Sequence, residues 1–291
     1  MCRGNGGPLA MAFAVVAAVS VAFAVPAAAA PPAPPPVLTY ADFADLADKA
    51  PVVLRAQVRK AVVVEPARAA GVRPGWVRLY IEARATVLLS GPALTGDALR
   101  YLADVPLDGK GDVPLDGKGK VPKLVKREVL LFARPVQGRP GELQLVAPDA
   151  QVLWSAEGES RLRGVLGELL AAGAPGPIRK VHEAIFVPGN LVGEGETQMF
   201  LETAGGEPAS ITVVHAPGSD RRWSVSFSEV VDSSGAPPRR ETLAWYRLAC
   251  FLPRALDPAA NVSSTDADRA QAGADYAWVL GEIGPCPRLR G

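Results

Sequence analysis

The stretch that decides the fold is WVRLYIEARATVLLSGP, Trp76–Pro92. Apolar and polar side chains alternate along it from Val77 to Val87. A period of two over that length predicts one long strand with a buried face and an exposed face. The first part of the chain is therefore predicted to be built on a sheet whose longest member is this strand.

Shorter strand signals lie on both sides of this stretch. A run of alternating residues precedes it within VVLRAQV, and a loop rich in Gly and Pro, residues 66–75, separates the two. REVLLFARPV contains a continuous apolar run, which predicts a strand buried on both faces. The predicted strands of this part cover residues 54–59, 77–87, 99–105, 129–133, 143–146 and 152–154.

Two helices are predicted at the ends of this strand-rich part. Thr39 and Asp42 have the spacing of a capping box, which predicts a short helix ending near Lys49. A second helix is indicated by apolar residues that recur at helical spacing and are followed by Gly173 and Pro175. That apolar face consists of Leu162, Val165, Leu166, Leu169 and Leu170. We predict a domain boundary just after this helix, at residues 174–177.

The segment from about Leu46 to Arg163 resembles the netrin-like or metalloproteinase-inhibitor type of OB-fold barrel. The resemblance rests on VVLRAQV, WVRLYIEARATVLLSGP, REVLLFARPV and GELQLVAPDAQVLW. It implies a small barrel for residues 38–174, completed by the helix described above. In the inhibitor family an N-terminal cysteine chelates the zinc of the protease. This segment contains no cysteine, so the inhibitory mechanism is not implied.

The second half, residues 175–291, has strand signals separated by turns. These predicted strands cover residues 181–187, 198–203, 211–215 and 223–231. Residues 241–252 are apolar on most sides and are predicted to form a buried helix, with a strand as the alternative. A capping box at Thr265 and Asp268 predicts a last helix that runs towards Gly281 or Gly284. The fold class is thus α+β, mainly β: a small OB-like barrel plus a helix, followed by an antiparallel sheet covered by one or two helices.

Residues 1–29 have the three parts of a secretory signal peptide. Arg3 is followed by an apolar run and then by the small residues Ala27–Ala29, which predict cleavage before Ala30. Residues 30–37 form a proline-rich spacer. The prediction is a periplasmic or extracellular protein with no stable membrane span after cleavage. The alternative is a signal segment retained as a membrane anchor.

Charge excludes some partner classes. Removal of the signal segment takes away only Arg3, so the remaining chain has equal numbers of basic and acidic residues. Nothing in this balance favours nucleic acid or an anionic membrane surface. The predicted partner is an envelope protein or a small ligand of unknown identity.

Two cysteines remain after the signal segment, Cys250 and Cys286. An even pair in an oxidising compartment predicts a disulfide bond. The alternatives are two free thiols or a metal pair, although no histidine lies near either cysteine in the sequence.

The octapeptide DVPLDGKG occurs twice, at residues 104–111 and 112–119, and we interpret it as a tolerant surface loop. It does not form a P-loop, because Gly119 stands where a Ser or Thr is needed and a proline interrupts the motif. The aspartates of the repeat also lack the spacing of a calcium loop. The basic residues that follow are interpreted as a solvated loop, with an anionic partner as the alternative. They are Lys118, Lys120, Lys123, Lys126 and Arg127.

The only histidines are His182 and His215, each on a predicted strand. No nucleophile elbow and no paired zinc-binding histidines accompany them, so both are interpreted as structural. No catalytic, cofactor-binding or metal-binding residue and no cofactor is predicted. The leading hypothesis is a non-catalytic binding or scaffolding module of the cell envelope. The alternatives are a hydrolase, which would bring a histidine and a carboxylate together in a cleft, and an inhibitor of an extracellular enzyme, which would present an exposed rigid loop.

The signal segment gives a direct prediction. Its apolar run ends in small residues and no cluster of charged stop-transfer residues follows, so the exported protein should begin near Ala30. Intact-mass measurement of secreted or periplasmic protein checks this. A full-length chain held in the membrane fraction would contradict it.

Overall fold

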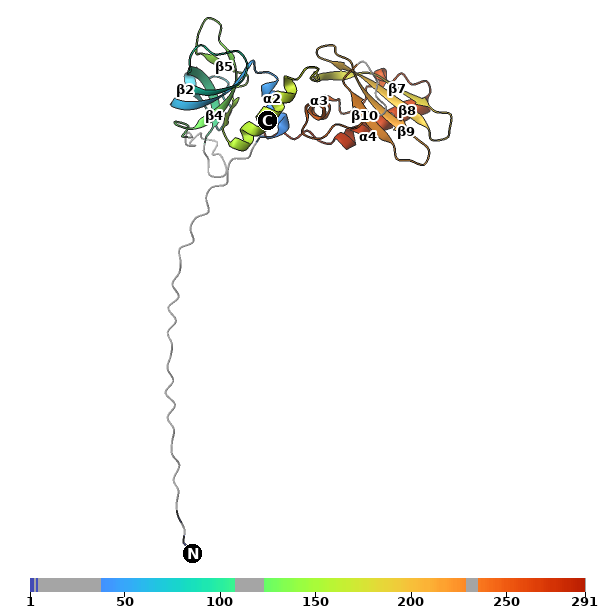
Figure 1. The fold of residues 1–291 in the computed structure, drawn as a ribbon, viewed down its shortest axis with the longest axis horizontal. Coiled ribbons are helices and arrows are strands. Elements are labelled where there is room, and N and C mark those ends of the chain that lie inside the picture. The colour runs from blue at the N-terminus through green and yellow to red at the C-terminus, as the bar shows by residue number, and fades with distance from the viewer. Residues whose placement is uncertain (3, 5–37, 108–122, 229–234, 291) are drawn as a thin grey trace. The chain divides into compact units, whose positions relative to one another are not determined.

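The computed structural model describes residues 1, 2, 4, 38–107, 123–228 and 235–290 (Figure 1). The predicted spacer and nearly all of the predicted signal segment lie outside the described residues, as does most of the octapeptide repeat. From Leu38 onwards, the described residues belong to one compact unit. No helix in the described part of the chain is long and apolar enough to cross a membrane.

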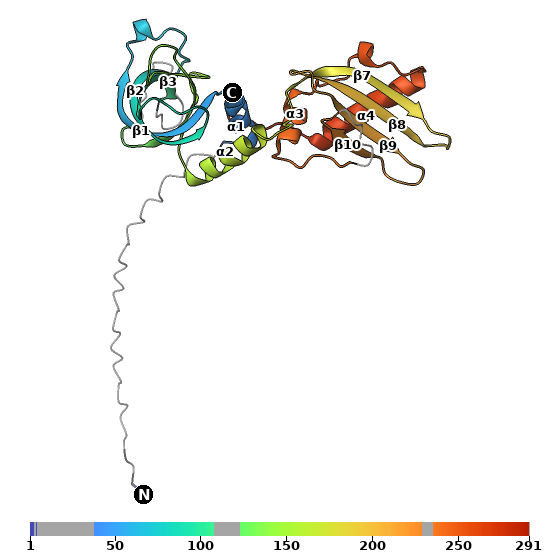
Figure 2. The same cartoon turned by 45° about the horizontal axis from the view of Figure 1, so that its top comes forward.

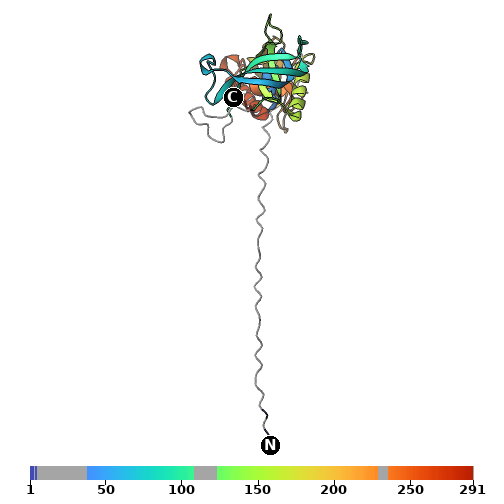
Figure 3. The same ribbon diagram turned by 90° about the vertical axis from the view of Figure 1, so that its left-hand side faces the viewer.

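The first half contains one antiparallel sheet, and every strand predicted there is present. The strand order is β3-β2-β1-β4-β5, and β6 also pairs with β4. Figure 3 shows the blue and cyan strands β1 and β2 of this sheet facing the viewer. The elements are α1 (Tyr40–Ala47), β1 (Val52–Val63), the 3-10 turn η1 (Pro66–Arg68), β2 (Trp76–Ser90), β3 (Ala98–Pro106), β4 (Glu128–Pro135), β5 (Leu143–Leu145), β6 (Gln151–Leu153) and α2 (Ala156–Leu169).

The predicted fold class, α+β and mainly β, is confirmed, but the sheet of the first half does not close into a barrel among the described residues. The edge strands β3 and β5 are not joined by a ladder, and a single isolated parallel bridge links Arg100 to Glu142. Strand β5 has only three residues, and all of them pair with β4. It is therefore too short to form a second ladder along β3, and the sheet has a seam there.

The octapeptide repeat is not entirely a loop. Its first three residues, Asp104–Pro106, form the end of strand β3 and pair with β2. The alternation of apolar side chains continues up to Val105, and burial of that face extends the strand into the repeat.

The second half is a four-stranded antiparallel sheet of order β10-β9-β8-β7, with α4 along one face (Figure 2). Its elements are β7 (Ile178–Pro188), β8 (Gly195–Thr203), β9 (Ala209–His215), β10 (Arg222–Ser226), α3 (Leu243–Phe251), the 3-10 turn η2 (Pro258–Ala260) and α4 (Asp266–Ile283). Strand β10 ends at Ser226, and residues 229–231 of the predicted strand lie outside the described residues. Residues 241–252 contain the predicted helix and not the alternative strand.

Local capping explains where the helices begin. Both predicted capping boxes are present: Thr39 with Asp42 starts α1, and Thr265 with Asp268 starts α4. The hydroxyl of Thr242 accepts a hydrogen bond from the Trp245 N–H and so starts α3. The predicted apolar face of α2 extends too far, because Leu170 lies beyond the helix and is exposed.

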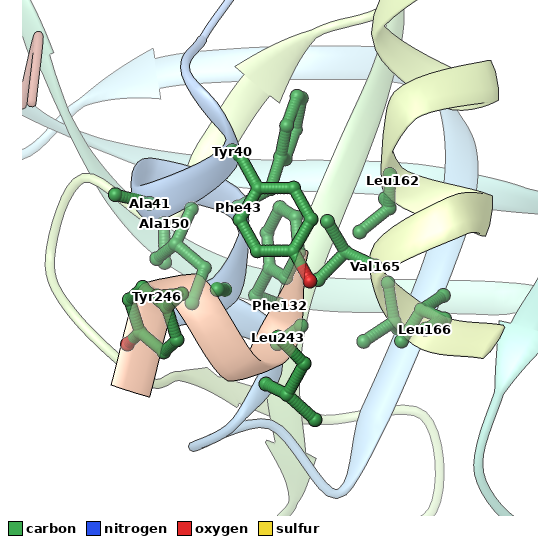
Figure 4. Close-up of a cluster of buried hydrophobic side chains, with 14 of the residues drawn as sticks. Tyr40, Ala41, Phe43, Phe132, Ala150, Leu162, Val165, Leu166, Leu243 and Tyr246 are labelled. Atoms are coloured by element: carbon green, nitrogen blue, oxygen red, sulfur yellow. The ribbon is translucent and has the colours of Figure 1, made fainter. Parts of the chain in front are cut away.

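Helix α3 packs against helices of the first half. Figure 4 shows Leu243 and Tyr246 of α3 in one cluster with Tyr40 and Phe43 of α1. Leu162, Val165 and Leu166 of α2 complete that cluster. The predicted domain boundary falls in the connection between α2 and β7. That residues 38–174 and 175–291 fold as separate domains stays a prediction.

Three aspartates on α1 and at its C-terminal end, spaced three residues apart, bind groups from the second half. Asp48 forms a double salt bridge with Arg247, a residue only 3% exposed, at 2.9 Å for each contact. Asp45 accepts hydrogen bonds from Arg288 and from the Tyr246 hydroxyl. Residues three apart on a helix lie on the same side, so these carboxylates form one stripe.

The third aspartate, Asp42, binds backbone. Its carboxylate accepts the N–H groups of Leu289 (3.0 Å) and Arg290 (3.1 Å). Arg290 also forms a salt bridge of 2.6 Å with Asp149. We call residues 285–290 the C-terminal strap, because these contacts hold it across α1.

The predicted disulfide is present. Cys250 on α3 and Cys286 at the start of the strap are bonded, with 5.2 Å between their Cα atoms. The bond joins residues 36 positions apart, and it holds the strap to α3.

Loss of the disulfide should destabilise the protein. Cys250→Ser, Cys286→Ser and the double variant should each lose about 2–4 kcal/mol of unfolding free energy, because one crosslink constrains the unfolded chain. Urea unfolding measures this loss. The double variant is the control, since it should lose no more than either single variant. Unfolding free energies equal to that of the unmodified protein would contradict the prediction.

The Asp45 carboxylate should make stability depend on acid. Burial opposes its ionisation, but the hydrogen bonds from Arg288 and Tyr246 outweigh burial and lower its pKa. A group with a lowered pKa contributes its stability above the unfolded-state pKa of about 3.9 and loses it as pH falls through the folded value. The stability difference between the unmodified protein and Asp45→Asn should therefore shrink below about pH 4.

Urea unfolding at a series of pH values measures that difference. Asp97→Asn is the control, because Asp97 pairs with Arg84 on an exposed surface and should contribute little at any pH. A difference for Asp45→Asn that stays constant down to pH 3 would contradict the role given to Asp45.

Candidate functional site

The seam between β3 and β5 opens into a pocket of about 580 Å³. Two backbone hydrogen bonds close its ends: the Arg100 N–H donates to the Gly141 carbonyl, and the Asp104 N–H donates to the Pro148 carbonyl. The lining residues come from β2, β3, β5, the β4–β5 connection and the β5–β6 connection. They are Arg78, Tyr80, Arg100, Tyr101, Leu102, Asp104, Val136, Arg139, Glu142, Leu143, Gln144, Leu145 and Pro148.

Register decides which charges face this seam pocket. On the outer face of the sheet, Arg78 lies opposite Asp104 and Tyr80 lies opposite Leu102. Arg78 makes two hydrogen bonds to the Asp104 carboxylate, at 2.7 and 2.8 Å, and these bonds raise the pKa of Arg78. This pair is therefore neutral as a unit and marks one end of the pocket.

Arg100 has a different position in the charge pattern. The residue opposite it on β2 is Glu82, but the Glu82 carboxylate pairs instead with Lys60 of β1 at 3.4 Å. The side chain of Arg100 forms no hydrogen bond or ion pair with any residue that the structure describes. A guanidinium group carries five N–H donors and stays charged at all physiological pH values. The N–H groups of the Arg100 side chain can therefore donate hydrogen bonds to a ligand at the pocket rim.

The β4–β5 connection forms the opposite rim. Arg139 and Glu142 form a salt bridge of 3.3 Å there. Gly141 has φ of +79°, and a Cβ at this position would lie 2.7 Å from the Ala98 carbonyl oxygen. The close approach of this connection to β3 therefore requires a glycine at position 141.

Apolar side chains make the floor and part of the wall. Tyr101, Leu143 and Leu145 are buried core residues that face the pocket from below, while Leu102 is 49% exposed. The Tyr101 hydroxyl donates to the Gln151 side chain at 2.6 Å, and burial raises its pKa, so the ring stays neutral. The pocket thus combines apolar side chains with guanidinium groups, a combination that suits a small ligand with a polar and an apolar part.

A second hollow of about 390 Å³ adjoins the seam pocket and shares Asp104 and Pro148 with it. Asp149 lies between two arginines there, with Arg73 at 3.1 Å and Arg290 of the strap at 2.6 Å. Because Arg290 of the strap and Arg73 of a loop both pair with the Asp149 carboxylate, this hollow is part of the contact that the strap makes.

His215 does meet a carboxylate. Its Nε2 lies 2.8 Å from Asp275, a fully buried residue of α4. The same carboxylate accepts hydrogen bonds from Thr197, Gln271 and Arg221. The Thr197 hydroxyl donates to the carboxylate and not to the histidine. No described hydroxyl or thiol bonds to His215, and the cluster holds α4 against the sheet.

His182 is exposed on β7 beside a register shift, and no carboxylate among residues 38–107, 123–228 and 235–290 pairs with it. In the predicted basic cluster, Lys118 and Lys120 lie outside the described residues. Lys123, Lys126 and Arg127 are exposed just before β4.

The hairpin tip between β7 and β8 is exposed and internally held. The Glu194 carboxylate accepts the N–H groups of Asn190 and Leu191 at 3.0 and 3.1 Å. Leu191 is 63% exposed and Val192 is fully exposed. The inhibitor hypothesis requires an exposed rigid loop or edge, and this tip is the candidate loop; the hypothesis itself stays a prediction.

Among the described residues, no group of three or more His, Cys, Asp or Glu side chains could hold a metal ion. No protein-family model matches the chain, and no curated protein matches it.

Sequence reasoning missed the seam pocket. The alternating runs of β2 and β3 could have revealed the pairing of Arg78 with Asp104, because both face outwards on neighbouring strands. Arg139 and Glu142 come from a separate loop, and no local pattern placed them beside Arg100.

Proposed function

We propose that this chain is an exported, non-catalytic binding protein of the cell envelope or the extracellular space, and that its ligand occupies the seam pocket. The observation that carries the proposal is Arg100, a guanidinium group without a partner among the described residues, on the rim of a pocket with an apolar floor. The pocket volume falls within the range of small-molecule sites, about 300–1,000 Å³. The disulfide supports export, because such bonds persist in oxidising compartments.

The OB-like relationship remains part of this proposal. The strand order β3-β2-β1-β4-β5 and the parallel bridge between Arg100 and Glu142 support it. OB folds bind their ligands on the face of strands 2 and 3 and on the loop between strands 4 and 5. The seam pocket is lined by the corresponding parts of this chain.

A hydrolase is the second candidate, and the contact between His215 and Asp275 is the observation that favours it. Catalysis there would need a nucleophile or an activated water at the other ring nitrogen of the histidine. The inhibitor hypothesis draws its support from the hairpin tip with Leu191 and Val192. The seam pocket and the adjoining hollow, both formed by described residues, include no residue of either site, so we place both candidates behind the seam pocket.

The proposal predicts that capture of a partner or small ligand depends on Arg100. The tagged protein should retain a bound molecule from periplasmic or secreted extract, and Arg100→Glu should lose it because the rim becomes anionic. Mass spectrometry of the eluted material identifies what is bound. Arg59→Glu is the matched control, since Arg59 is an exposed arginine of β1 outside the pocket. Identical eluates from all three proteins would contradict the proposal.

A further inference from the structure

The two closed ends of the seam limit the shape of the ligand. The backbone bond between Arg100 and Gly141 ties β3 to the β4–β5 connection at one end of the pocket, and the bond between Asp104 and Pro148 ties β3 to the β5–β6 connection at the other end. A polymer cannot run through the seam between these bonds. The part of the ligand that enters must therefore be compact, such as a small molecule or a single terminal group.

The charges of the lining limit the charge of the ligand. The pocket is lined by three guanidinium groups and two carboxylates, and both carboxylates are already paired, Asp104 with Arg78 and Glu142 with Arg139. Only Arg100 remains to neutralise a bound anion. Arg100 can therefore neutralise one negative charge on a ligand. A second negative charge on the ligand would have no cationic partner in this partly desolvated site. A cationic ligand would meet the unpaired guanidinium and be repelled.

The apolar side chains of the pocket floor determine which uncharged group of a ligand fits. Tyr101, Leu143 and Leu145 offer apolar surface beneath the rim, and Tyr80 and Leu102 lie opposite each other beside it. Each buried CH₂ group of a ligand gains about 0.8 kcal/mol from such surface. A guanidinium group binds a carboxylate through two parallel hydrogen bonds, which gives a preferred geometry for the head group.

We infer that the seam pocket binds an amphipathic monoanion, a small carboxylate whose apolar alkyl or aryl body lies on the floor while its head group pairs with Arg100. This inference rests on the proposed function and narrows it to a ligand class. The Arg78–Asp104 and Arg139–Glu142 pairs stay intact in the complex and act as neutral end walls.

The test uses octanoate, 1-octanol and acetate as probes, with binding to the full exported protein measured by calorimetry. Octanoate should bind, and it should bind more tightly than 1-octanol, because only the carboxylate can pair with Arg100. Acetate should not bind measurably, since it lacks the apolar body. Arg100→Gln should weaken octanoate binding about tenfold or more, as expected for a charged hydrogen bond. The same variant should bind 1-octanol with unchanged affinity.

Two further variants make the result specific. Arg59→Gln removes the same charge outside the pocket and should bind octanoate like the unmodified protein. Leu102→Asp places a carboxylate on the pocket wall, so it should weaken the binding of octanoate more than the binding of 1-octanol. Circular dichroism confirms that each variant is folded.

The outcomes separate this inference from the proposed function. The inference that the ligand is a monoanion would be overturned if octanoate and 1-octanol bound with equal affinity. It would also be overturned if Arg100→Gln did not change the affinity for octanoate. No binding of octanoate at millimolar concentration would also overturn the ligand class. If capture from extract still depended on Arg100, the proposed function would survive that failure. If capture were also independent of Arg100, both would fail.

Discussion

The stripe of aspartates along α1 is the constraint on which the arrangement of the fold depends. Asp48, Asp45 and Asp42 each bind a different group from the far end of the chain. Asp42 is the most deeply buried of the three aspartates, at 1% exposed. Arg247 is 3% exposed whereas its partner Asp48 is partly exposed, so loss of Asp48 would leave a buried guanidinium group without its carboxylate, and this contact favours one placement of α3. The disulfide bonds the strap to α3, and the backbone of the strap forms hydrogen bonds to Asp42 of α1.

This anchoring bears on the site, because the strap reaches the loop that closes one end of the seam. Arg290 holds Asp149, and the neighbouring Pro148 accepts the backbone hydrogen bond from Asp104. The other end is closed by Arg100 and Gly141. A short β5 with a ladder only to β4 leaves the seam open between these two points. The pocket thus results from a strand that is too short to complete a barrel, held at both ends by single backbone bonds.

Much of the fold was predictable because its signals are local. Alternation gave the strands of both sheets, and Thr39 and Thr265 gave two helix starts, since each depends on neighbours a few residues away. The open seam was not predictable, because it depends on the length of β5 and on its partner. That Arg100 lacks an ion-pair partner among the described residues was also hidden, because Glu82, its neighbour across the strand pair, binds Lys60 of β1. The three-residue spacing of Asp42, Asp45 and Asp48 is visible in the sequence. Their partners could not be predicted, because they lie some 200 residues away along the chain.

The central claim is that the seam pocket is where this protein binds its ligand. The most direct test is a crystal structure of the oxidised protein purified from its own cells without refolding or detergent. If the seam pocket binds the ligand, electron density for a compact molecule should occupy the seam, with an anionic group at Arg100 and an apolar group over Tyr101 and Leu143. A molecule bound at His215 or at the β7–β8 hairpin tip, with the seam filled only by water, would contradict it.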